Sequence, residues 1–114
     1  MINIDNVKPL EESSCVARVT FFDMSSPPAA VTPDSVTYTL TDTAGTVINS
    51  VLDTAISAAA TVNIVLSGDD LNLTEGVGKK RRLLVEYVYD STYGNNLPGK
   101  EEIEFEIAEV AASV

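Results

Sequence analysis

The chain has 114 residues, of which 45% are hydrophobic and 21% charged, and its formal net charge is −10, from 17 acidic and 7 basic residues. This length and composition are typical of one globular domain and argue against a second domain or a wholly disordered chain. The negative charge argues against binding to nucleic acid or anionic lipid, since both repel an acidic surface. No apolar run approaches the length of a membrane-spanning helix, and the opening residues lack the pattern of a secretion signal.

Residues 1–13 are predicted to form an N-terminal arm or a weak edge strand, because Pro9 needs no ladder donor at an edge. Residues 14–108 form the predicted β-domain. Within it, residues 14–23 alternate apolar and polar side chains, which predicts a strand. Cys15, the only cysteine, is in phase with the inward positions, so we expect a buried thiol and no disulfide. Adjacent prolines then predict a loop over residues 24–33.

The clearest alternation covers residues 35–42, and a turn ending at Gly45 is expected to join this strand to another over residues 46–52. A further strand is predicted over residues 58–67, in spite of its run of alanines. Ser67 then has the features of a helix N-cap, which predicts one short helical turn near residues 68–75.

The last two predicted strands, residues 79–90 and 100–108, are expected to pair as a hairpin around a long loop over residues 90–99. The final strand carries a row of glutamates on alternate positions, and we expect the basic side chains of residues 79–82 to pair with them. Residues 109–114 are predicted to be a flexible tail. Seven segments of this kind predict an all-β fold, a seven-stranded antiparallel Greek-key sandwich, with a small barrel as the alternative.

The chain contains no histidine, so the common catalytic sets and metal-ligand sets are incomplete, and we expect no enzyme activity, no cofactor and no metal site. Six loop residues carry oxygen atoms that calcium prefers, but their spacing matches no EF-hand loop and we expect them to form caps and turns. They are Asp69, Asp70, Asn72, Asp90, Asn95 and Asn96.

Apolar residues on the outer faces of the predicted strands favour binding to a partner protein as the function. Val16, Phe22, Leu84 and Val88 lie opposite the inward series of their strands, so they would form an exposed apolar patch if both outer faces belonged to one sheet. An alternative is that the N-terminal segment or a loop covers them. The predicted partner-binding residues, including two from the long loop, are Val16, Phe22, Leu84, Val88, Tyr93 and Leu97.

The order and lengths of the predicted strands resemble those of immunoglobulin-like and fibronectin type III-like domains. In that resemblance residues 14–23 are the second strand, residues 35–42 the third, residues 46–52 the fourth, residues 58–67 the fifth and the final hairpin the last two. The chain departs from the family pattern because it has no tryptophan and no cysteine pair.

A narrower resemblance lies in residues 81–107, where an Asp-Ser-x-x-Gly-x-x-Leu-Pro connector precedes an acidic, alternating strand. This hairpin is similar to those of small Ig-like structural proteins of tailed bacteriophages. The resemblance implies a virion protein, most simply a capsid decoration or cement protein, made in the host bacterial cytoplasm and bound in multiple symmetric copies to capsid, connector or tail proteins. The alternatives are an adhesion or carbohydrate-binding module and an acidic inhibitor that mimics DNA.

Overall fold

The computed structural model describes residues 2–4, 9–23, 27–74 and 76–109, and within them the chain is all-β apart from one short 3-10 helix. The strands form two antiparallel sheets, one with the order β1-β2-β5 and one with the order β4-β3-β6-β7. Their bounds are β1 Ile2–Ile4, β2 Ser14–Thr20, β3 Ser35–Asp42, β4 Thr54–Ile56, β5 Thr61–Ser67, β6 Lys80–Ser91 and β7 Gly94–Glu106, with the 3-10 helix η1 at Gly68–Leu71.

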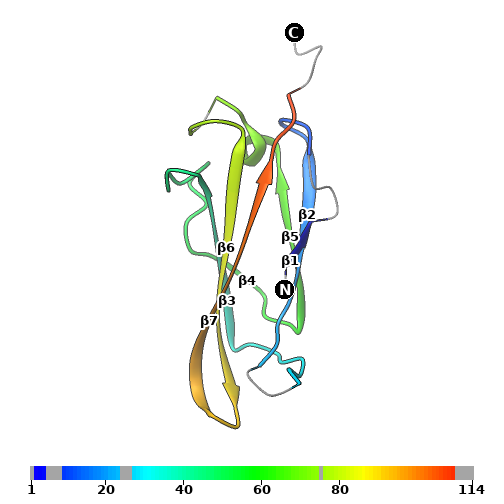
Figure 1. Cartoon of the computed structure of the whole chain (residues 1–114), viewed down its shortest axis with the longest axis vertical. Helices are drawn as coiled ribbons and strands as arrows, with labels where there is room; N and C mark the ends of the chain where they lie inside the picture. The colour runs from blue at the N-terminus through cyan, green and yellow to red at the C-terminus, as the bar shows by residue number, and fades with distance from the viewer. Residues whose placement is uncertain (1, 5–8, 24–26, 75, 110–114) are drawn as a thin grey trace.

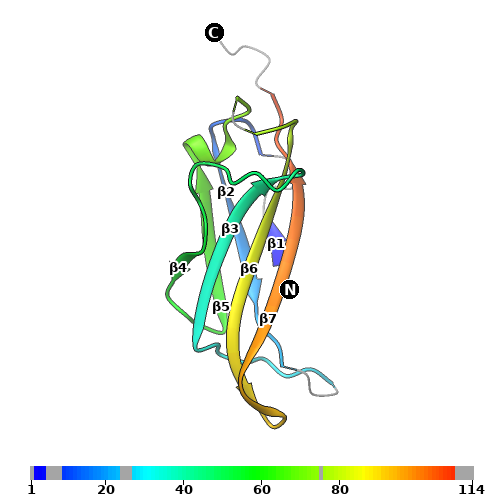
Figure 2. The ribbon, with the colours of Figure 1, turned by 90° about the vertical axis from the view of Figure 1, so that its left-hand side faces the viewer.

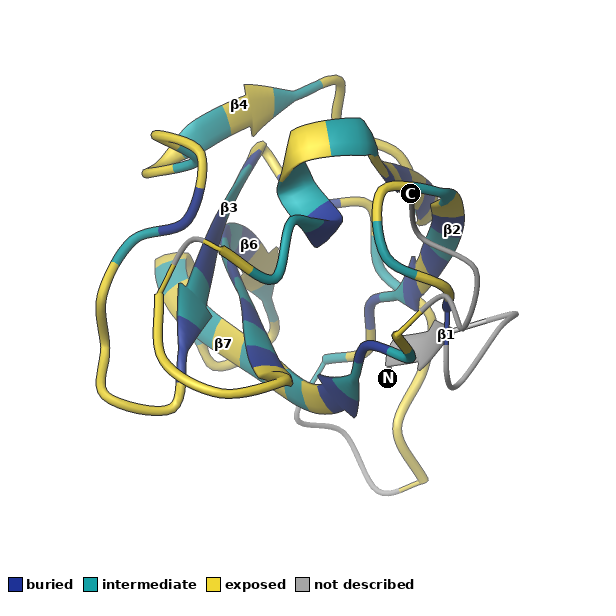
Figure 3. Ribbon diagram, turned by 90° about the horizontal axis from the view of Figure 1, so that it is seen from above, coloured by how far each residue is buried: buried dark blue, intermediate teal, exposed yellow. Residues whose placement is uncertain are grey.

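The two sheets face each other along the length of an elongated molecule of 54 × 23 × 21 Å (Figure 1). Seen from above, the buried residues of the long strands line the space between the sheets (Figure 3). Alternation of side chains along the strands explains this layering. Exposed and buried residues alternate along the whole of β5, and half-buried and buried residues alternate along most of β6. The strands lie in two separate sheets in the described part of the chain, not in one closed barrel.

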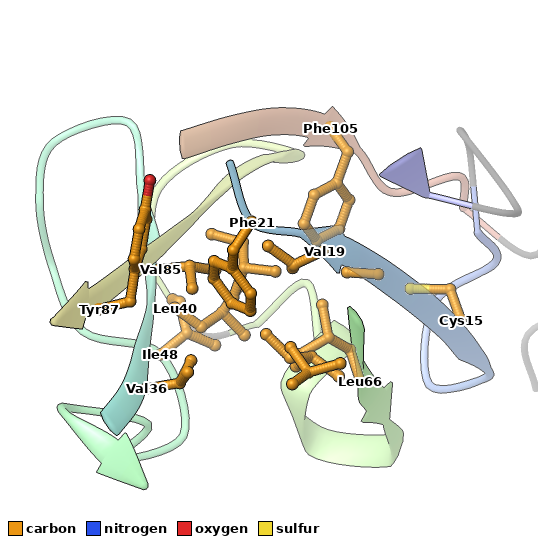
Figure 4. Close-up of a cluster of buried hydrophobic side chains, with 14 of the residues drawn as sticks. Cys15, Val19, Phe21, Val36, Leu40, Ile48, Leu66, Val85, Tyr87 and Phe105 are labelled. Carbon is orange, nitrogen blue, oxygen red and sulfur yellow. The ribbon is translucent and has the colours of Figure 1, made fainter. Parts of the chain in front are cut away.

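Side chains from both sheets form one hydrophobic core (Figure 4). Phe21, directly after β2, lies among them, and its ring centroid is 4.7 Å from that of Tyr87 on β6. The members that are completely or almost completely buried include Ala17, Val19, Phe21, Val36, Leu40, Ile48, Ile64, Leu66, Leu71, Leu83, Val85 and Ile107. Burial of this many aliphatic and aromatic side chains is the main driving force for the fold.

Most predicted strands are confirmed. Residues 14–23, 35–42 and 79–90 match β2, β3 and β6 closely. Their predicted inward residues are buried, including the Cys15 thiol, except that Tyr38 is only half-buried. β1 occupies a sheet edge, as expected for the N-terminal segment. The helical turn predicted after Ser67 is also found, although it ends at Leu71. The remainder of the predicted arm at residues 5–8, part of the loop at residues 24–26 and most of the tail lie outside the described residues.

The strand predicted over residues 46–52 is wrong. Only Val47 makes a bridge, to Thr41, and the short strand β4 forms later. Asn49 and Ser50 have positive φ angles of 52° and 57°, and Asp53 has 45°; three such left-handed residues interrupt an extended strand. The predicted Asp42–Gly45 turn is nevertheless present, with Gly45 at φ 88°. In addition, the strand predicted from residue 58 begins only at Thr61.

The long loop predicted over residues 90–99 is also wrong. β7 begins at Gly94 and pairs with β6 through almost its whole length, so the connection is a tight turn. Pro98 and Gly99 suggested a loop, but a proline is tolerated in β7 because the strand lies at a sheet edge. The consequence is a long β6–β7 hairpin in place of a flexible connector.

Candidate partner-binding surface

The six residues predicted to bind a partner do not form one patch. Val16 lies on β2, in the three-stranded sheet, whereas Leu84 and Val88 lie on β6, in the four-stranded sheet. The outer faces of two facing sheets point in opposite directions, so the condition for one apolar patch, that both outer faces belong to one sheet, is not met. Val16, Leu84 and Val88 are each half-buried by their neighbours.

Four of the six predicted residues lie toward one end of the molecule, called here the hairpin end and made of residues 21–23, 27–34 and 88–98. The end of β2, the start of β3 and the β6–β7 turn meet there, because the strands run antiparallel. Figure 1 shows this end at the bottom. The predicted residues that lie there are Phe22, Val88, Tyr93 and Leu97.

The tip of the β6–β7 hairpin projects past the rest of its sheet. β3 begins opposite Val88, so the residues of β6 beyond it pair only with β7 (Figure 2). Two side chains brace the tip: the Asp90 carboxylate accepts the Asn96 N–H at 2.8 Å, and the Ser91 hydroxyl accepts the Tyr93 N–H at 3.0 Å. The Tyr93 side chain is 68% exposed. The hairpin therefore presents an aromatic ring on a braced two-stranded arm.

Leu97 differs from Tyr93. It pairs with the buried Tyr89 across the hairpin and packs against the core while remaining half-buried. Its main role in this arrangement is to support the base of the tip.

A second arm lies beside the hairpin at the same end. Phe22 and Ala30 form an antiparallel bridge, and the Asp23 carboxylate accepts the Ala29 N–H at 3.0 Å. Phe22 is 38% exposed, and Pro27 and Pro28 in the same arm are exposed. Proline loses little conformational entropy on binding because its ring fixes φ. Both arms therefore offer apolar groups on backbone that is held by hydrogen bonds.

The outer face of the four-stranded sheet is charged. As expected, Lys80 and Arg82 lie 3.7 and 3.4 Å from the Glu104 carboxylate. A further pair, not predicted, joins Lys100 to Glu86 at 3.9 Å. Lys79 pairs instead with Glu109 at 3.4 Å. These side chains are 39–67% exposed, so each pair contributes little to stability. Alternating signs of charge make this face solvated and poorly suited to apolar docking.

Arg81 is the exception in the basic run, because its side chain is completely buried. It lies directly opposite Asp42 on β3, and the Asp42 side chain is completely buried as well. The Arg81 guanidinium donates to the carbonyl oxygens of Gly78, Lys80 and Asn72 at 2.9, 2.9 and 3.2 Å. The sequence interpretation missed this pair, although both residues are in phase with the inward positions of their strands.

The Asp42 carboxylate joins two loops at the end opposite the hairpin end. It accepts the N–H groups of Ala44 and Thr46 at 2.8 and 2.9 Å, and that of Val77 at 2.8 Å. Burial raises the pKa of this carboxyl, but the three N–H groups and the Arg81 charge together lower the pKa below its ordinary value of 3.8. The Asp42–Arg81 pair has a structural role, since backbone N–H groups occupy the carboxylate oxygens of Asp42.

The candidate calcium-binding oxygens largely form caps and turns, as predicted. Asp70 accepts the Ser67 N–H at 3.0 Å, Asn72 accepts the Thr74 N–H at 2.8 Å, and Asp90 braces the hairpin tip. Among the described residues, no three His, Cys, Asp or Glu side chains gather in a way that could hold a metal ion.

The chain matches no protein-family model, no curated protein and no solved structure. Within the described ranges no helix has the length and hydropathy that crossing a bilayer requires.

Proposed function

We propose that this chain is a non-enzymatic structural protein of a tailed bacteriophage virion, a capsid decoration or cement protein that docks onto capsid or connector proteins through its hairpin end. The observation that carries the proposal is the pair of braced arms at that end, which expose Tyr93 and Phe22. Aromatic side chains on rigid backbone are typical anchors of protein interfaces, because they bury much area at a low entropy cost.

The strand order supports an immunoglobulin-like, Greek-key assignment within this proposal. The chain crosses between the sheets after β2, after β4 and after β5, so the pairs β2–β5 and β3–β6 interlock. Three strands facing four in this order resemble a fibronectin type III-like domain. Parallel pairing of Leu10 with Ala108 links the N-terminal segment to the end of β7 and closes the opposite end of the molecule.

The braced hairpin also agrees with the resemblance to phage Ig-like proteins that the connector motif suggests. Asp90 and Ser91 of that motif hold the tip, and Leu97 packs at its base. The motif residues therefore have a physical role in presenting Tyr93. Repeated copies on a symmetric shell would use this small surface many times, and isolated docking of each copy is expected to be weak because the arms are narrow.

Charge restricts the partner. With a net charge of −10, the chain is repelled by acidic surfaces, so the docking site on the shell is expected to be apolar at its centre and neutral or basic around it. Increasing ionic strength should therefore slow association without abolishing the bound state.

The test is co-sedimentation with particles of the phage or induced prophage whose genome encodes the chain. We expect wild-type protein to sediment with the particles and the double variant Phe22→Ser, Tyr93→Ser to remain in the supernatant. Val77→Ser is the matched control, because Val77 is 61% exposed but lies at the opposite end. Equal sedimentation of all three proteins would refute docking by the hairpin end, and absence of the wild-type protein from particles would refute the virion role.

A carbohydrate-binding module is the second candidate, favoured by the exposed ring of Tyr93, since sugars stack on such rings. Titration with a glycan panel, followed by the Tyr93 signals in NMR spectra, separates the two candidates. Saturable glycan binding that Tyr93→Ser abolishes would favour this second function, whereas an unresponsive Tyr93 would leave the docking proposal in place.

A further inference from the structure

We propose that the open edge of β5 accepts an extended strand of a partner protein, which would add a fourth strand to the three-stranded sheet. This surface is independent of the virion proposal, because it lies on the three-stranded sheet and not at the hairpin end. It is called here the β5 edge and is made of Thr61, Asn63 and Val65.

The hydrogen-bond pattern of β2 and β5 shows which backbone groups face outward. Phe21 N–H donates to the Ala60 carbonyl at 3.2 Å, and Gly68 N–H donates to the Ser13 carbonyl at 2.9 Å. Antiparallel pairs alternate between bonded and non-bonded, and the register from β2 to β5 is unbroken, so the even-numbered residues of β5 bond to β2. The N–H and C=O groups of the β5 edge point the other way, and no described residue pairs with them.

The other described sheet edges are protected. β1 and β4 have only three residues each. β7 is long, but it carries Pro98, Lys100 and four glutamates, and the chain directly after it pairs with residues 9–11. β5 has seven residues with no charge, no proline, no glycine and no bulge. Natural sheets use charges, prolines, bulges and short edges to prevent strand addition, so β5 lacks the protection that the other edges have.

The surroundings of the β5 edge favour a single strand as the occupant. Figure 2 shows β4 lying outside β5, so the four-stranded sheet extends past this edge. An added strand would lie opposite β4 and cover Ile56, which is paired with Val36, faces the core and is only half-buried. A second copy of this chain would bring its own four-stranded sheet against β4, which leaves no room for continuous pairing of the two β5 strands.

The chemistry of the added strand follows from the same residues. Its inward side chains should be apolar and alternate with polar ones, because Val62, Ile64 and Leu66 alternate in this way on β5. Val65, which is 58% exposed on the outer face, would gain a neighbour. The exposed Asp69 directly beyond β5 and the net charge of −10 favour a lysine or arginine near the end of the strand.

The test uses the whole chain, labelled with ¹⁵N, and a synthetic peptide of sequence Lys-Thr-Val-Thr-Val-Thr-Val-Lys. Without peptide, the amides of Thr61, Asn63 and Val65 should exchange quickly with solvent, while those of Val62 and Ile64 are protected. With peptide, the outward amides should shift and their exchange should slow by about fivefold or more, the factor expected for one added hydrogen bond. A control peptide with proline in place of its central threonine should have no such effect.

Two variants test the same edge from the protein side. Asn63→Pro removes an outward N–H without removing a donor to β2, and Asn63→Ala is its matched control. Val65→Lys places a charge on the edge and covers the case in which the proline variant fails to fold. Both Asn63→Pro and Val65→Lys should abolish the peptide effect, and Asn63→Ala should retain it.

Three results would overturn the proposal: protected amides at the β5 edge in the free protein, peptide-induced shifts confined to other strands, or a sedimenting dimer that Val65→Lys disrupts, which would make a second copy the occupant. These results are distinct from a failure of particle co-sedimentation, which depends on the hairpin end.

Discussion

The ring of Tyr87 lies over Gly99, its partner across the β6–β7 ladder, so closely that a Cβ atom at residue 99 would stand 2.3 Å from the ring carbon Cζ. Tyr87 also contacts Phe21 and Tyr89, which prevents its ring from moving aside. We therefore expect Gly99→Ala to lower the free energy of unfolding by about 1–3 kcal/mol, as overpacking does. Urea denaturation followed by circular dichroism measures this change.

The cost of Gly99→Ala should depend on the Tyr87 ring. In a Tyr87→Ala background, which is itself less stable, Gly99→Ala should have almost no further effect, because the obstructing ring is absent. Equal costs in both backgrounds would show that residue 99 acts through the backbone and not through Tyr87. Pro98→Ala, at an exposed neighbouring position, serves as the control.

The buried Asp42 carboxylate should make the free energy of unfolding depend on pH in the acidic range. Its pKa is lower in the folded chain than its ordinary value of 3.8, so its contribution is complete above about pH 4 and is lost as the pH falls through the folded pKa. Asp42→Asn should lower stability at pH 7 and should remove part of the acid dependence of the unfolding free energy. Denaturation curves collected between pH 2 and pH 7 on both proteins measure the difference.

Asp69→Asn is the control for that series, since Asp69 is exposed and neighbours no buried cation. Its stability profile should follow that of the wild-type protein. If Asp42→Asn and the wild-type protein show the same slope below pH 4, the carboxylate does not hold the two loops in the way the hydrogen bonds indicate.

Thr39 fixes the irregular segment between β3 and β4. Its hydroxyl accepts the Asp53 N–H at 2.9 Å, and the Thr39 side chain is almost completely buried. Thr39→Val keeps the shape and removes the acceptor, so we expect a loss of about 1 kcal/mol in unfolding free energy. Amide exchange at Asp53 should accelerate, and an unchanged exchange rate would argue against this bond. Thr37→Val, on the same strand, is the comparison variant.

The Cys15 thiol should be inert in the native protein. Burial and the nearby Asp70 charge raise its pKa, so little thiolate is present at pH 8. Reaction with Ellman's reagent should be at least about 100-fold slower in buffer than in concentrated urea, because the thiol must first become exposed. Rapid reaction of the folded protein would contradict the burial of this residue.

Regular alternation in the sequence predicted the strands that form the core. Cys15–Phe21 and Leu83–Tyr89 place every second side chain inward, and each of those side chains is buried. The same alternation applies to Asp42 and Arg81, which occupy inward-facing positions of β3 and β6. The basic run of residues 79–82 was expected to pair with the glutamates of the final strand, but Arg81 is buried opposite the buried Asp42. Two opposite charges at inward positions of two strands indicate a buried charge pair of this kind.

Local sequence was a poor guide where tertiary contacts determine the backbone. Residues 46–52 have strand-forming side chains, but their backbone bonds with Leu40 require the turn at Asn49 and Ser50. Pro98 and Gly99 have the composition of a loop, yet the edge position and the Tyr87 ring make both suitable for β7. Of the predicted binding residues, Phe22 and Tyr93 are exposed at one end, whereas the placement of Val16 and Leu84 depended on sheet membership, which alternation does not specify.

The virion proposal is tested most directly by electron cryo-microscopy of the particles proposed to carry the chain, which would locate it and its orientation in one measurement. We expect one elongated density per symmetric site, with the β6–β7 tip and the Phe22 arm against the shell and the η1 end pointing outward. Densities that contact the shell through the η1 end, or particles that carry no such density, would contradict docking by the hairpin end.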